Sequence, residues 1–228
     1  MDAEAVAISA SLLGLSTLLF VLSARALVRF AETRSRSQAM WGVGLALATA
    51  AMVVESVVYF GFVSSGILQA YVFFSAAIVG VLSLGATKIL KSPRIENAYT
   101  AYIAGSIAVV GAACALTPLP TSMVGGGIIL GNPPLLLIVL SSLVTVPATI
   151  VLLTATAVSL RRSRRWQSLL MAAGAIILGA GGTLYIASFP IALYYAEFLG
   201  ILLLFLGLVS LQSTAPAPAP TPVTRPTA

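Results

Sequence analysis

Residues 39–63 read AMWGVGLALATAAMVVESVVYFGFV. This stretch contains a single charged residue, Glu55, and its other side chains are neutral and mostly apolar. A helix needs about 20 mainly apolar residues to cross the hydrocarbon core of a bilayer. Residues 39–63 are therefore predicted to form a membrane-spanning helix, and similar stretches elsewhere in the chain define the fold.

Six further stretches have the same character, and the composition agrees with them. The chain of 228 residues is 59% hydrophobic and 8% charged, whereas soluble domains are about one quarter charged. We predict an all-α, polytopic membrane protein in which residues 1–212 form a single seven-transmembrane-helix bundle. The predicted spans are about 5–29, 39–63, 67–90, 97–117, 134–160, 167–189 and 190–212.

The basic residues predict how the bundle is oriented. The segments around the ends of the first, third and fifth spans contain 11 of the 12 Lys and Arg residues. By the positive-inside rule the N-terminus is then outside and the C-terminus cytoplasmic, which is expected of a multi-pass protein of the cell membrane. We interpret the basic clusters as topology determinants beside lipid headgroups, with the lipid bilayer as partner and no nucleic acid.

The two ends of the chain differ from the spans between them. The chain begins with acidic Asp2 and Glu4 rather than with a positive region, so the first span is expected to remain as an anchor and not to be a cleaved signal. Residues 213–228 are rich in Pro, Ala and Thr and lack the apolar surface needed to fold. They are predicted to form a disordered cytoplasmic tail.

Two acids, Glu55 and Glu197, are the only charged residues deep inside the predicted spans. Glu55 lies eight residues before the outer end of its span, and Glu197 lies seven residues after the start of the last span. At about 1.5 Å per residue, both lie roughly 10–12 Å below the outer surface, in one layer. Because an ionisable side chain inside a bilayer usually faces a cavity or a partner, the pair is a candidate site.

Hydroxyl groups accompany both acids. Each glutamate has a tyrosine three or four residues away, and a tyrosine and a serine repeat this spacing in span 67–90. Such spacings make neighbours on one helix face. Alternatively, the tyrosines belong to an aromatic belt and the acids only hold helices together by hydrogen bonds. The candidate ligand- or proton-binding residues are Glu55, Glu197, Tyr59, Tyr194, Tyr71 and Ser75.

Several classes of chemistry are disfavoured by the residue types. The chain has no histidine and a single cysteine, Cys114. Imidazole-based metal and haem sites, an intrachain disulfide and a His-dependent catalytic triad are therefore not expected. The sequence predicts no metal, no cofactor and no enzyme activity.

Three local features add further expectations. Residues 118–134, PLPTSMVGGGIILGNPP, are favoured as a surface loop, with a re-entrant lid as the alternative. Pro147 is expected to kink its span and to free backbone carbonyls. The glycines of span 167–189 allow close helix packing, and a homo-oligomer or a membrane-complex partner could use that face.

The predicted topology resembles that of microbial rhodopsins, many receptors and several small transporters. A retinal pigment is not supported, because the last span, PIALYYAEFLGILLLFLGLVSLQ, contains no lysine. We expect the protein to bind or translocate a small solute or ion through an outward-facing intramembrane cavity, with proton coupling as one form of this activity. The alternative is a non-transporting accessory or sensory seven-helix subunit of a membrane complex.

Overall fold

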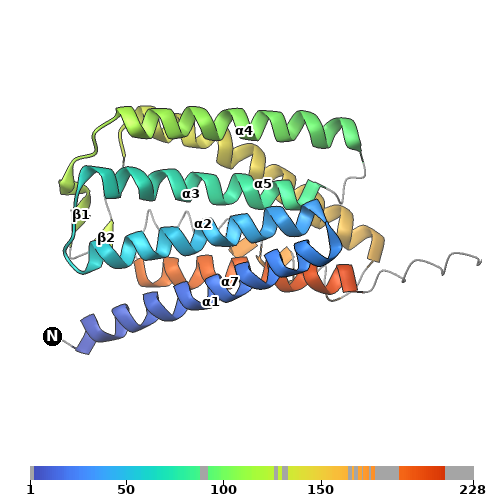
Figure 1. Cartoon of the computed structure of the whole chain (residues 1–228), viewed down its shortest axis with the longest axis horizontal. Coiled ribbons are helices and arrows are strands. Elements are labelled where there is room, and N and C mark those ends of the chain that lie inside the picture. The colour runs from blue at the N-terminus through green and yellow to red at the C-terminus, as the bar shows by residue number, and fades with distance from the viewer. Residues whose placement is uncertain are drawn as a thin grey trace, which may run out of the picture.

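The computed structural model describes residues 3–87, 92–125, 128–129, 133–163 and 190–213, with short pieces between 166 and 177. Long helices account for most of these residues (Figure 1). Among the described residues, the first five helices are long and apolar enough to cross a membrane. The helices are α1 (Ala3–Thr33), α2 (Arg36–Tyr59), α3 (Ser65–Ala86), α4 (Pro93–Leu116), α5 (Leu135–Ser163) and α7 (Pro190–Ser213).

These helices confirm the all-α class and are those expected of a membrane-embedded chain. Helix α2 ends at Tyr59, earlier than predicted, because the chain turns at Gly61, whose φ of 89° is in the left-handed region that favours glycine. Helix α3 begins after Ser64, whose side chain accepts a hydrogen bond from the backbone N–H of Ile67. The predicted span 167–189 and the predicted tail beyond Ser213 lie outside the continuously described residues.

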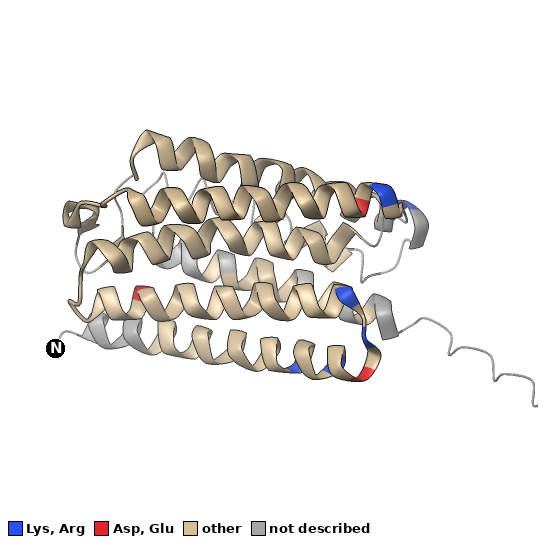
Figure 2. Ribbon diagram, turned by 45° about the horizontal axis from the view of Figure 1, so that its top comes forward, with Lys and Arg blue, Asp and Glu red and all other residues tan. Residues whose placement is uncertain are grey.

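The described basic residues gather at one end of the bundle (Figure 2). At this end α1, α3 and α5 finish and α2 and α4 begin. The opposite end, which we call the hairpin end, holds the α2–α3 turn and the start of α5, and its described part contains no Lys or Arg. We define the basic end by Arg25, Arg29, Arg34, Arg36, Arg94 and Arg161.

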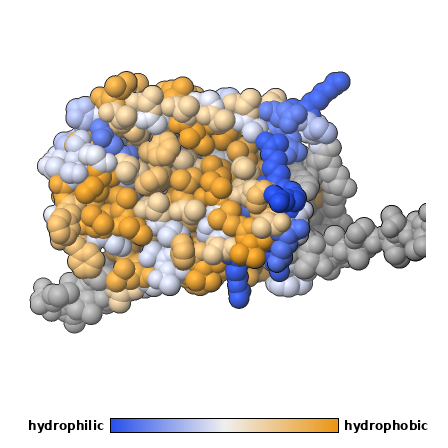
Figure 3. Space-filling model, in the orientation of Figure 1, coloured by the Kyte–Doolittle hydropathy of each residue, from blue (hydrophilic) through white to orange (hydrophobic). Residues whose placement is uncertain are grey.

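Between the two ends, the outside of the bundle is apolar. Figure 3 shows one face dominated by hydrophobic residues, with hydrophilic ones gathered toward one end. Large apolar side chains such as Phe20, Val109 and Ile150 are 63%, 52% and 58% exposed. Such exposure would be costly in water and is suited to contact with lipid chains.

The connection between α4 and α5 contains a short hairpin that the all-α prediction did not include. A single 3-10 turn (Thr121–Met123) leads into β1 (Val124–Gly125), which pairs antiparallel with β2 (Ile128–Ile129). Leu119, Met123 and Ile129 are buried against the hairpin ends of the helices. Residues 118, 120–122 and 125 are exposed, so the described part of the loop lies at the surface as favoured, and its three buried side chains pack against the helices as a cap.

Hydrogen bonds from α3 hold this cap in place. The hydroxyl oxygen of Ser65 accepts from the backbone N–H of Leu119 at 2.8 Å. The amide of Gln69 donates to the carbonyl of Thr117, also at 2.8 Å. Polar side chains one turn apart on α3 therefore satisfy the backbone where the chain leaves α4.

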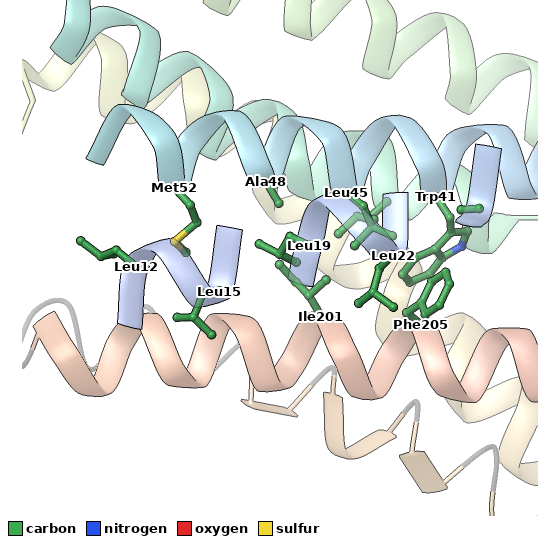
Figure 4. Packing of buried hydrophobic residues seen from close by; sticks show 12 residues of the cluster. Leu12, Leu15, Leu19, Leu22, Trp41, Leu45, Ala48, Met52, Ile201 and Phe205 are labelled. Carbon is green, nitrogen blue, oxygen red and sulfur yellow. The ribbon is translucent and has the colours of Figure 1, made fainter. Parts of the chain in front are cut away.

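The core forms two main seams. One joins α1, α2 and α7, where leucines of α1 interleave with Leu45 and Met52 of α2 and with Ile201 and Phe205 of α7 (Figure 4). The indole of Trp41 lies 6.5 Å from the ring of Phe205, centre to centre. The second seam joins α3, α4 and α5.

Pro147 lies inside α5, as the sequence indicates. Proline has no N–H, so the carbonyl four residues earlier, that of Leu143, loses its usual helical partner. The hydroxyl of Tyr102 on α4 donates to this carbonyl at 2.7 Å. A carbonyl freed in α5 is thus satisfied by a neighbouring helix.

Candidate functional site

Helices α2, α3, α5 and α7 enclose a cavity of about 130 Å³, which we call the Glu55 cavity. An engineered apolar cavity of about 150 Å³ holds one benzene molecule, so this space fits one small solute or several waters. The side chains around it are mainly apolar. They are Ala48, Ala51, Met52 and Glu55 of α2, Tyr71, Ser75, Ile78, Val79 and Leu82 of α3, Thr149, Leu152 and Leu153 of α5, and Ile201 of α7.

Glu55 lies on the face of α2 that forms one wall of the cavity. Ala48, Ala51 and Met52 precede it by seven, four and three residues, which is the spacing of a single helix face. The two alanines leave space beside the carboxyl group. Glu55 is only 3% exposed and is the one buried acid among the residues whose side chains are described.

Tyr71 and Ser75 line the wall formed by α3, one helical turn apart. Both side chains are partly buried. The structure therefore brings three of the candidates, from two helices, to one space. A buried carboxylate is costly unless a partner, a cation or a proton compensates its charge, so this cluster is the polar centre of the cavity.

Thr149 is a fourth polar lining residue, and the sequence reasoning missed it. Its hydroxyl donates to the carbonyl of Thr145 at 2.8 Å, as threonines in apolar helices commonly do. The available signal was its place two residues after the internal Pro147, where α5 departs from regular hydrogen bonding.

Tyr59 does not line the Glu55 cavity. It lies in the last turn of α2 and packs against the seam of α1, α2 and α7. Its ring also makes an edge contact with that of Phe60, with centres 6.2 Å apart. Glu197 and Tyr194 lie in helix α7, but the structure does not describe their side chains.

The electrostatic surroundings of Glu55 differ from those of the acids at the basic end. Glu96 pairs there with Arg36 at 3.5 Å, near solvent. None of the residues described as lining the Glu55 cavity is a Lys or Arg. Within the described part of the chain, no three His, Cys, Asp or Glu residues gather in a way that could hold a metal ion.

No known family model matches the sequence, and no curated protein or solved structure matches it significantly. The function is therefore argued from the chemistry of the Glu55 cavity.

Proposed function

We propose that the protein binds or translocates a small solute or ion through the Glu55 cavity, within the membrane. The observation that carries this proposal is a buried carboxyl group beside a space of about 130 Å³. Two hydroxyl-bearing side chains, Tyr71 and Ser75, line the same space. Intramembrane carboxyl groups are rare because they are costly, and where they occur they commonly mark a pathway for ions, protons or substrates.

The lining favours a ligand with a single positive charge. It offers one carboxyl group, three hydroxyls and apolar walls. Ca²⁺ takes six to eight oxygen ligands and Mg²⁺ near-ideal octahedral geometry, so this cavity suits neither. A proton, a small monovalent cation or a small protonated amine suits it better, because a carboxylate forms strong charge-assisted hydrogen bonds with such groups.

Glu197 is proposed as a second acid of this site. Its position in α7 lies one turn before Ile201, which lines the cavity. Residues four apart lie on the same side of a helix. The similar depths of Glu55 and Glu197 below the outer surface, inferred from the sequence, support the same pairing.

The seven-helix topology is also proposed. Helix α5 begins at the hairpin end, where Leu137 packs with Val58 and Leu68, and it ends at the basic end. Helix α7 runs parallel to α1, because the hydroxyls of Ser11 and Tyr195 lie 2.7 Å apart near the starts of both helices. We infer that the chain returns between α5 and α7, because residues 164–189 are long enough for one crossing.

We use the positive-inside rule to propose which end of the bundle faces the cytoplasm. It assigns the basic end to the cytoplasm and the hairpin end to the outside. The N-terminus would be outside and the C-terminus cytoplasmic, in the cell membrane. The Glu55 cavity would lie nearer to the outer surface, because Glu55 is only four residues from the end of α2.

The test uses the full chain reconstituted in liposomes. Proton flux is followed with an enclosed pH-sensitive dye under an imposed potential, and cation uptake with radiolabelled methylammonium. We expect Glu55→Gln to lower whichever activity the wild type shows by about tenfold or more, because the charge that attracts the cation is lost. Glu96→Gln, which removes an acid at the exposed basic end, is the matched control and should retain the activity.

Activity that survives in both Glu55→Gln and the Glu55→Gln, Glu197→Gln double variant would refute the proposal. Absence of flux and of binding in the wild type, together with a membrane protein that co-purifies, would instead favour the accessory or sensory subunit. The thermal unfolding temperature in detergent checks that each variant is folded.

A further inference from the structure

A second hollow lies on the surface of α1, near the basic end. Toward the middle of the bundle it is lined by Phe20, Val21 and Ala24, and toward the basic end by Arg25, Val28, Arg29 and Glu32. We call it the α1 groove. It is separate from the Glu55 cavity, to which α1 contributes no described side chain.

The apolar part of the α1 groove is open to the surroundings of the bundle. Phe20 and Val21 are 63% and 44% exposed. They lie in the part of α1 that is apolar enough to cross a membrane. This part of the groove therefore faces the acyl-chain region of the bilayer.

The polar part carries two exposed arginines on one helix face. Arg25 and Arg29 are one turn apart, a spacing at which like charges repel each other. Neither guanidinium forms an ion pair with a described acid, since the described ion pair joins Arg36 and Glu96. An anion held between them would remove this repulsion.

The depth of Arg25 indicates where that anion comes from. Arg25 lies four residues before the predicted end of the first span at residue 29, about 6 Å along the helix axis. An arginine side chain at this depth extends toward the headgroup layer, where lipid phosphates lie. Guanidinium groups bind phosphate oxygens in pairs of parallel hydrogen bonds.

We propose that the α1 groove binds one phospholipid with an anionic headgroup. Arg25 and Arg29 hold the phosphate, and an acyl chain lies along Phe20 and Val21. Glu32, three residues after Arg29, lies at the outer edge of the groove and repels further negative charge. The groove therefore suits a headgroup with a single phosphodiester and neutral hydroxyls better than one with several phosphates.

The experiment uses the detergent-solubilised full chain and native mass spectrometry. The protein is titrated with phosphatidylglycerol and phosphatidylcholine that have identical acyl chains. We expect the first lipid adduct to favour phosphatidylglycerol, and the Arg25→Gln, Arg29→Gln variant to weaken that adduct about tenfold or more. Glu32→Gln should bind it equally or more tightly.

Arg161→Gln is the matched control. Arg161 is an exposed arginine at the same end of the bundle but on α5, outside the groove. We expect this variant to change binding of phosphatidylglycerol less than about twofold. A loss equal to that of the double variant would show that only net charge matters, and equal binding of phosphatidylcholine would also overturn the proposal.

Folding of the variants is checked by gel filtration and thermal unfolding in detergent. If the double variant is not monodisperse, the single variants Arg25→Gln and Arg29→Gln replace it, each with an expected loss of about threefold. Unchanged binding in both single variants would refute the site.

Discussion

Pro147 and Tyr102 form a coupled pair of residues. Because Pro147 cannot donate to the carbonyl of Leu143, that carbonyl depends on the Tyr102 hydroxyl, 2.7 Å away. We expect Tyr102→Phe to lower the free energy of unfolding by about 1 kcal/mol, the usual cost of one lost hydrogen bond. Unfolding in mixed detergent micelles, followed by circular dichroism, measures the change.

A double-mutant cycle isolates this interaction. In a Pro147→Ala background, residue 147 regains its N–H and can bond the carbonyl of Leu143 itself. The cost of Tyr102→Phe should then fall close to zero. An undiminished cost would show that the hydroxyl of Tyr102 contributes to stability independently of the N–H that is missing at Pro147.

At the residue scale, polar side chains inside apolar runs were the informative signal. Glu55, Tyr71 and Ser75 stand out in the sequence for that reason, and the structure brings them to one cavity. Tyr59 shares the four-residue spacing but lies in the last turn of α2, where it packs toward α1 and α7. Thr149 was missed because hydroxyls in apolar helices commonly bond their own backbone.

At the scale of elements, the helices α2 and α3 approach closely at Gly85. A Cβ at this position would overlap the indole ring of Trp41, which is fully buried. Ser37 also donates a hydrogen bond to the carbonyl of Gly85 at 2.7 Å, which holds the backbones together. We expect Gly85→Ala to cost about 1–3 kcal/mol, as overpacking of a core usually does.

Gly105→Ala is the matched control for this prediction. Gly105 also lies inside an apolar helix, but no atom is within 4 Å of the position that a Cβ would take. Alanine favours helix over glycine, so this variant should be unchanged or slightly more stable. Thermal unfolding in detergent compares the two, and equal losses would contradict the packing explanation.

The sequence predicts where the helices lie along the chain better than it predicts where they end or that β1 and β2 form a hairpin. Hydropathy over about 20 residues locates α1 to α5, because lipid solvation imposes that length. The end of α2 depends on the local turn at Gly61, which hydropathy does not detect. The strands β1 and β2 have two residues each, too few to show the alternation of a strand, so their pairing depends on tertiary packing.

At the scale of the whole molecule, the contacts between distant helices support the proposed odd number of crossings. Trp41 at the start of α2 meets Phe205 in the second half of α7, while Ser11 meets Tyr195 near the start of α7. Helix α7 is therefore antiparallel to α2 and directed toward the basic end. With α5 directed the same way, an odd number of spans is the consistent count.

Cysteine labelling in intact cells tests this topology. Cys114 is 3% exposed, and Cys114→Ser provides a background without cysteine. In that background, Ser122→Cys in the hairpin cap should react with a membrane-impermeant maleimide from outside, because residue 122 is exposed at the hairpin end. Thr33→Cys, at the basic end of α1, should react only after the membrane is permeabilised.

The decisive position is residue 213, the last of α7. With seven crossings, Ser213→Cys has to be labelled in parallel with Thr33→Cys, because both helices start at the hairpin end and finish at the basic end. With six crossings it would be labelled like Ser122→Cys, from outside. That result would place the end of α7 among the outer loops, and it would leave the short distance between Ser11 and Tyr195 without an explanation.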